Sequence, residues 1–192
     1  MSHFLALMAR MKHIRRWGTM RSVEAENVQE HSHMVAMVAH MLAVIAGKRY
    51  GKQVDTKAVL QLALYHEAGE VITGDVVTPI KYFDDDIRQA FKHIEHIASA
   101  RLLSMIPDDL LGEYEPLLLP DEESEAWQLV KAADRICAHL KCVEEVKAGN
   151  REFEKAMAAT GQIVSAIELP EARDFMREFA PGFALALDEL NQ

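Results

Sequence analysis

The chain has 192 residues, of which 49% are apolar and 27% charged, a composition that predicts one globular domain spanning residues 1–192. Its formal net charge of −9 argues against a basic face that follows a nucleic-acid polymer, although a metal ion and an arginine can reverse the sign inside a small pocket. Two cysteines, no signal-peptide pattern and no apolar run near the roughly 20 residues of a membrane span predict a cytoplasmic protein with no membrane partner.

The first half of the chain predicts two helices. Apolar residues recur at three- and four-residue spacing over 35–46, which is typical of an amphipathic helix. Gly47 and Gly51 are expected to end this helix. A second helix is expected over 56–72, and the Gly- and Pro-containing segment 73–79 should break it.

The second half of the chain predicts further helices joined by loops of ordinary length. Their expected starts are residues that favour a helix beginning, namely Asp84, Pro107, Asp121 or Ser124, Asn150 and Pro170. No segment alternates as a strand does, and no internal repeat occurs. The sequence therefore predicts an all-α fold in a single compact domain.

Polar residues interrupt the second predicted helix just before its end. The sequence from His66 to Glu70 comes close to the zinc motif H-E-x-x-H, but its fifth residue is a glutamate, so that motif is absent. On a continuous helix, His66 and Glu70 would lie about 40° apart, with Glu67 on the flank of the same face. These residues belong either to a functional site or to a solvent-exposed helix end.

Two further polar positions lie beside apolar helix faces. His31 and His33 are two residues apart near a helix start, so at most one of them should face the core. Asp134 lies next to the apolar face of its predicted helix, where a carboxylate is costly unless it is paired or binds a metal. His31 is either a ligand or a structural residue, and Asp134 either a ligand or half of an ion pair.

Taken together, these residues resemble the H…HD…D pattern of the HD-domain phosphohydrolases, an all-helical superfamily that holds divalent metal between its core helices. Within it, the chain is similar to the bacterial 5'-deoxynucleotidase family over nearly its whole length, in order and at similar spacing. The similar segments are Arg15-Arg16-Trp17 with Met20-Arg21, Glu26-Asn27-Val28 with Glu30-His31-Ser32, Tyr65 to Phe83, Leu129 to Asp134 and Ala138 to Glu145. The resemblance implies metal-dependent hydrolysis of the 5'-phosphate of deoxyribonucleoside monophosphates.

The resemblance also implies a set of metal ligands, which are His31, His66, Glu67 and Asp134. Two imidazoles and two carboxylates suit Co, Mn, Fe or Zn. The family carries an aspartate where this chain has Glu67, whose carboxylate reaches one CH₂ group further. This difference predicts either ligation from a shifted helix or rotamer, or weaker metal binding.

Further roles follow from the resemblance. Glu70 matches the catalytic glutamate, which orients the attacking water or protonates the leaving 5'-oxygen. Arg16 matches a catalytic residue that orients the phosphate, and Trp17 one that packs on the sugar, where its ring would exclude a 2'-hydroxyl. The implied substrate-binding set is Arg16, Trp17, His31, Glu67, Asp75, Val76, Val77, Thr78 and Asp134. Each of these residues also has an alternative interpretation without a functional role. Glu70 would then be an exposed helix end, Arg16 a surface cation and Trp17 a core residue.

The sequence leaves two other functions open. The same site would serve a hydrolase of deoxynucleoside or modified nucleoside triphosphates, for which Lys12, Arg21 and Lys81 are candidate extra cations. A catalytically weak nucleotide-binding protein is the alternative if Glu67 damages the metal site. The resemblance further implies a homodimer. Apolar C-terminal residues such as Phe175, Phe179, Phe183 and Leu187 either contribute to its interface or complete the core.

Overall fold

Helices make up the regular secondary structure of the computed structural model, which describes residues 1–77 and 84–191. In chain order they are α1 (Phe4–Met8), η1 (Ala9–His13), α2 (Val28–Tyr50), α3 (Thr56–Tyr65), α4 (Glu70–Thr73), α6 (Asp85–Leu103), η2 (Asp108–Leu110), α7 (Leu111–Leu118), α8 (Glu125–Lys147), η3 (Arg151–Phe153), α9 (Glu154–Ser165), α10 (Pro170–Glu178), η4 (Ala180–Ala184) and α11 (Leu187–Leu190). These ranges contain no β-strand, which confirms the predicted all-α fold. None of the described helices has the length and apolar character needed to cross a membrane.

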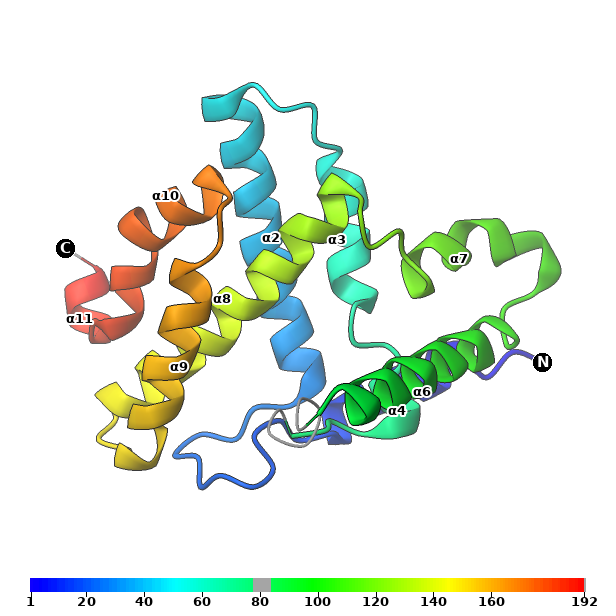
Figure 1. The fold of residues 1–192 in the computed structure, drawn as a ribbon, viewed down its shortest axis with the longest axis horizontal. Helices are drawn as coiled ribbons and strands as arrows, with labels where there is room; N and C mark the ends of the chain where they lie inside the picture. The colour runs from blue at the N-terminus through cyan, green and yellow to red at the C-terminus, as the bar shows by residue number, and fades with distance from the viewer. Residues whose placement is uncertain (78–83, 192) are drawn as a thin grey trace.

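Three helices, α2, α3 and α8, pack on one another and form the centre of the molecule. Figure 1 shows α2 and α8 crossing there, with α9, α10 and α11 on one side and α6 and α7 on the other. The buried residues at the crossing are mainly Val, Leu, Ile and Ala, including Leu42 on α2, Val59 on α3 and Leu129 on α8. Polar residues at this crossing are therefore enclosed by three helices that cannot shift independently.

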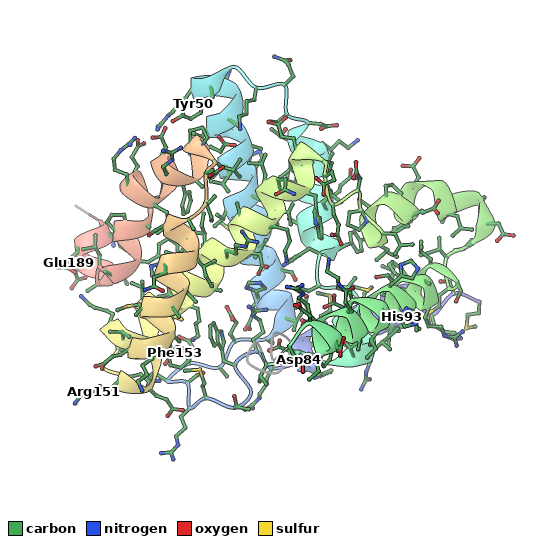
Figure 2. The ribbon with its side chains drawn as sticks, viewed as in Figure 1. Tyr50, Asp84, His93, Arg151, Phe153 and Glu189 are labelled. Carbon is green, nitrogen blue, oxygen red and sulfur yellow. The ribbon has the colours of Figure 1, made fainter. Side chains whose placement is uncertain are left out.

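The predicted end of α2 is only half correct. Gly51 ends the helix with a φ of 67°, a left-handed conformation that suits glycine, but Gly47 lies inside the helix. Tertiary contacts hold the last turn beyond Gly47. Arg49 Nη1 and the Tyr50 hydroxyl each donate to Asp174 Oδ2 on α10, at 2.9 Å, and Tyr50 is labelled at that end of α2 in Figure 2.

The predicted helix over 56–72 is interrupted. α3 ends at Tyr65, and residues 66–69 form a turn before α4 begins. In this turn, backbone N–H groups bond to carbonyls three residues earlier, at 2.9 and 3.0 Å. The His66 ring nitrogen Nδ1 also donates to the Ala63 carbonyl oxygen at 2.7 Å, the acceptor that a continuing α-helix would offer to residue 67.

Most predicted helix starts are confirmed. The side chains of Asp84 and Asn150 accept backbone N–H groups at the starts of α6 and η3. Ser124, rather than Asp121, caps α8. Pro170 occupies the first position of α10, and η4 and α11 follow this helix.

The irregular segment 14–27, between η1 and α2, is fastened to α8. Both carboxylate oxygens of Glu145 accept backbone N–H groups from this segment, from Val23 at 2.8 Å and from Glu24 at 3.2 Å. Lys141 Nζ donates to the Glu24 carbonyl oxygen at 2.7 Å and to Glu145 at 2.6 Å. Helix α8 thus satisfies three backbone groups of this irregular segment, and Glu152 and Asn150 satisfy the backbone N–H and carbonyl oxygen of Arg21.

Candidate active site

Four residues with metal-binding side chains meet where α2, α3 and α8 cross. His31 stands in the first turn of α2, His66 and Glu67 directly follow α3, and Asp134 lies near the middle of α8. One donor atom from each lies within 4.8 Å of the others. The structure thus brings together the four side chains that the sequence resemblance selected, and it also confirms that His31 is buried while His33 is exposed.

The His66 side chain has the arrangement that a metal ligand needs. Because a carbonyl oxygen can only accept, Nδ1 carries the proton in its bond to Ala63, and Nε2 presents a lone pair. Burial lowers the pKa of His66, which keeps the ring neutral. Among the described residues Nε2 has no hydrogen-bond partner although it is buried. A divalent cation would satisfy this atom, so the residues present fit a metal.

Asp134 faces His31 with one oxygen and a lysine with the other. Its Oδ1 lies 3.1 Å from His31 Nε2, and its Oδ2 lies 2.9 Å from Lys131 Nζ. Burial alone would raise the pKa of Asp134, but the Lys131 ammonium and the His31 hydrogen bond outweigh it and hold that pKa well below its usual range. The ion pair expected as one alternative for Asp134 is confirmed by the contact with Lys131, while its role as a metal ligand stays a prediction that its place in the cluster supports. Lys131 was not singled out from the sequence, where only its three-residue spacing from Asp134 hinted at the pair.

Glu70 begins α4 beside the cluster. Its carboxyl is hydrogen-bonded to Glu67, and Oε2 is buried without a partner in the described part of the chain. Burial, followed by the charge of Glu67 and the bond to it, raises the pKa of Glu70 to about 10, so this carboxyl carries a proton at neutral pH. The expected single helical face is wrong, since a turn separates His66 from α4, but Glu70 is not an exposed helix end either.

Arg16 and Trp17 approach the cluster from the segment before α2. Arg16 Nε and the Trp17 indole Nε1 both donate to Glu26 Oε2, at 3.0 and 3.1 Å. Burial alone would lower the pKa of Arg16, but the negative charges of Glu26 and then Asp134 outweigh it and raise that pKa. Trp17 packs on Phe153, with ring centroids 5.4 Å apart. Glu26 was missed as a site residue, since nothing local in the sequence pairs it with positions ten residues earlier.

The segment after α4 completes the wall of the site. Asp75 is partly buried, which raises its pKa, while Arg16 acts in the opposite direction, and its carboxylate is hydrogen-bonded by the Trp17 backbone. The expected substrate loop continues through Val76, Val77 and Thr78. Residues 76 and 77 are half-buried, and residue 78 lies outside the described residues. A small pocket beside this segment is bounded by Glu70, Val76 and Phe91 of α6.

Comparison with protein sequences gives a consistent result. Residues 3–183 match the family model described as 5'-deoxynucleotidase YfbR-like. A 5'-deoxynucleotidase of Klebsiella pneumoniae is 47% identical over 192 residues, covering 100% of this chain and 96% of that protein. A 5'-deoxynucleotidase of Shewanella oneidensis is 44% identical over 193 residues, covering 100% of this chain and 99% of that protein.

Solved structures with the same fold include an HD-domain phosphohydrolase from Listeria innocua. It has a TM-score of 0.82 at 21% identity and covers 94% of this chain and 88% of its own. An HD phosphohydrolase of cyanophage S-2L, solved with dA and one catalytic Zn²⁺ ion, has a TM-score of 0.64 at 20% identity, covering 93% of this chain and 95% of its own. At these identities the likeness concerns the fold.

Proposed function

The chain belongs to the YfbR-like 5'-deoxynucleotidase family, and from this membership we propose which of its residues carry the reaction. The protein is an enzyme that hydrolyses the 5'-phosphate of deoxyribonucleoside monophosphates and yields a deoxynucleoside and phosphate. The proposal rests on one observation above all, the convergence of His31, His66, Glu67 and Asp134 within 4.8 Å.

These four side chains are proposed to hold a divalent ion, which is Co, Mn, Fe or Zn. The donor set of two imidazoles and two carboxylates suits these ions. The Nε2 atom of His66, which is buried without a hydrogen-bond partner among the described residues, supports a metal at this point. When bound, such an ion supplies Lewis acidity for a phosphoryl oxygen and for the attacking water. The Lys131 ammonium beside Asp134 Oδ2 keeps that carboxylate ionised and oriented, with Oδ1 on the side of His31.

Glu70 is proposed as the general acid. Its raised pKa leaves a proton on the carboxyl at neutral pH, and this proton would pass to the leaving 5'-oxygen as the P–O bond breaks. The contact with Glu67 holds the carboxyl at the edge of the ligand cluster, where the phosphate would lie. After transfer, the charge on Glu70 would be countered by Arg16, whose charge already lowers the pKa of that carboxyl.

Arg16, Trp17 and the segment from Asp75 onward are proposed to bind the substrate. With Nε of Arg16 engaged by Glu26, its two Nη groups form the planar fork that would receive phosphate oxygens. The Trp17 ring would pack on the sugar and exclude a 2'-hydroxyl. Asp75 would accept a hydrogen bond from the 3'-hydroxyl, and Val76, Val77 and Thr78 would extend the pocket.

We further propose that residues 1–192 form one domain and that the enzyme is a cytoplasmic homodimer. Of the C-terminal apolar residues named for an interface, Phe175 is buried in the core and Leu187 is 75% exposed. Leu190, which lies with Leu187 on α11, is 56% exposed. Exposed leucines on α11 support a contact between copies. Light scattering on the purified protein tests the dimer, for which a monomer mass would be the contrary result.

The assignment is tested with metal-stripped protein to which Mn, Co, Mg or Zn is returned. The substrates are dAMP, AMP, dGMP, dATP and ATP, and chromatography separates phosphate from triphosphate. We expect phosphate from dAMP and dGMP and far less from AMP. Faster release from dATP would replace the monophosphate assignment with the triphosphate one. No turnover with any metal, also after Glu67→Asp, would point to a nucleotide-binding protein.

A further inference from the structure

Glu26 joins the two proposed substrate-binding residues Arg16 and Trp17, and we propose that it is a positioning residue through which the enzyme selects deoxyribose. The inference rests on the proposed function, in which Arg16 holds the phosphate and Trp17 faces the sugar. The Glu26 side chain touches neither the phosphate nor the sugar, and it fixes the distance between these two recognition elements.

A single carboxylate oxygen carries both contacts. Glu26 Oε2 accepts from Arg16 Nε at 3.0 Å and from the Trp17 indole Nε1 at 3.1 Å. The second oxygen, Oε1, lies 4.0 Å from Nδ1 of His31, a proposed metal ligand. The side chains of Arg16 and Glu26 are only 12% and 16% exposed, so the ion pair is poorly screened by solvent.

The backbone brings Glu26 to this place. Arg16 N donates to the Glu26 carbonyl oxygen at 3.0 Å, and Val28 N donates to the Ile14 carbonyl oxygen at 3.0 Å. Around these bonds, Arg15 and Asn27 form an isolated antiparallel bridge. The two short segments are thus paired as in a sheet, and their side chains are held in register although they lie ten residues apart.

Trp17 has a backbone conformation that its surroundings must maintain. Its φ of 58° lies in the left-handed region, and among the described residues it is the only non-glycine with a positive φ. Such a conformation persists where contacts over-determine it, and it is frequent at binding sites. The Trp17 contacts include the indole bond to Glu26, the ring contact with Phe153, the backbone bond to Asp75 and the Met20 N–H donated to the Trp17 carbonyl oxygen.

A shared acceptor has a consequence for selectivity. Because Arg16 and Trp17 donate to the same oxygen, neither can move without disturbing the other. In a nucleotide the phosphate and the sugar are covalently joined, so a ribose that is pushed away by Trp17 also carries its phosphate out of line with Arg16. Without Glu26 the two residues become independent, and the penalty for a 2'-hydroxyl should fall.

The kinetic test uses Glu26→Ala and Glu26→Gln, with Glu24→Gln as the matched control. Glu24 is an exposed carboxylate in the same segment whose backbone, rather than its side chain, makes the contacts to α8. We expect Glu26→Ala to lower kcat/KM for dAMP by roughly 10- to 100-fold, in the range found for residues that orient a reactive group. The ratio of dAMP to AMP cleavage should fall several-fold, and Glu26→Gln should recover part of both losses.

A purely structural role predicts a different result. Loss of folded protein lowers the rates with dAMP and AMP equally, so an unchanged ratio in Glu26→Ala overturns the proposal. The metal content of each variant is measured as well, because Glu26 lies near His31 and a lost ion would also lower both rates. Glu24→Gln should match the wild-type enzyme in rate and ratio.

A spectroscopic test does not depend on turnover. The chain has two tryptophans, so a ¹H–¹⁵N spectrum contains two indole resonances, and Trp17→Phe assigns them. Glu26→Gln should shift the resonance of Trp17 and leave that of Trp127 in place, and an unmoved Trp17 resonance contradicts the proposal. If the wild-type enzyme cleaves no deoxynucleotide, the proposed function fails, while this spectrum still decides whether Glu26 positions Trp17.

Discussion

The His66 imidazole and the Glu67 carboxylate lie 3.6 Å apart, measured from Nε2 to Oε1, on a turn that interrupts the expected helix. Both side chains offer a donor atom to the same cluster, together with His31 and Asp134. This turn is the local feature on which the candidate metal site depends.

The first prediction concerns the charge of Glu67. We expect Glu67→Gln to bind metal more weakly than Glu67→Asp, because the amide removes a negative charge whereas aspartate only shortens its reach. At an ion concentration of 100 times the dissociation constant, metal binding stabilises the wild-type protein by about 2.7 kcal/mol. A variant that binds the metal more weakly gains less of this stabilisation, and thermal unfolding measures the difference. His93→Gln is the control, since His93 is exposed on α6 (Figure 2). Equal losses in the two Glu67 variants would contradict a charge-based role.

The second prediction concerns proton donation by Glu70. We expect Glu70→Gln to lower kcat for dAMP by about 10²- to 10⁴-fold, the usual range for a positioned acid or base, while KM changes little. Metal content should be retained, because Glu70 is not among the four proposed ligands. A substrate whose leaving group needs no proton, such as a p-nitrophenyl phosphate ester, should be much less affected. An equal loss with both substrates would remove Glu70 from the acid role.

The third prediction concerns the Trp17 ring. Replacing it in Trp17→Ala should raise AMP cleavage relative to dAMP cleavage, by roughly 10-fold or more in the ratio of kcat/KM, because space for a 2'-hydroxyl opens. Trp127→Phe is the matched control, since this ring lies beneath Lys131 on α8 rather than beside Glu26. A Trp17→Ala enzyme that still rejects AMP would place sugar selection elsewhere.

The fourth prediction concerns the acid stability that Glu145 confers. Burial alone would raise the pKa of Glu145, but Lys141 and backbone N–H groups outweigh it and lower that pKa from 4.5 to about 2. A carboxyl with a depressed pKa contributes stability above its unfolded value, and that contribution is lost as the pH falls through its folded value. The free energy of unfolding should therefore decrease between about pH 4.5 and pH 2 as Glu145 becomes protonated.

Urea unfolding across this pH range tests the prediction. Glu145→Gln should be less stable than the wild-type protein at pH 7, by about 1–3 kcal/mol for the disturbed buried hydrogen bonds, and should show a shallower acid dependence. Glu113→Gln, which alters an exposed carboxylate on α7, should retain the wild-type slope. An identical acid slope in Glu145→Gln would show that other carboxylates control acid unfolding.

Local sequence signals predicted the helices well where the determining interactions are themselves local. Ser124 and Asp84 cap helices through bonds to backbone N–H groups three residues later. Because both partners are close in the chain, the residue type alone predicts the cap. Pro170 starts a helix because its fixed φ suits the first position. The resemblance to a family selected the four residues of the metal-binding cluster, although their roles as ligands stay predictions.

Features that depend on distant contacts could not be predicted. Gly47 was expected to end α2, but Arg49 and Tyr50 continue the helix by binding Asp174, a residue more than 120 positions away. The end of α3 depends on the side-chain bond of His66, which competes with helix continuation. A short backbone pairing brings Glu26 to Arg16, and no periodicity of the sequence predicts this pairing.

The anchoring of residues 14–27 to Glu145 and Lys141 bears on how substrate recognition proceeds. Although this segment has no regular structure, its backbone is held by α8, and Trp17 and Arg16 extend from it with their positions already defined. If Trp17 and Arg16 bind the nucleotide as proposed, this wall is preorganised for it, and little conformational entropy would be lost there on binding. The proposed discrimination against ribose would then arise at the encounter itself, before any chemical step.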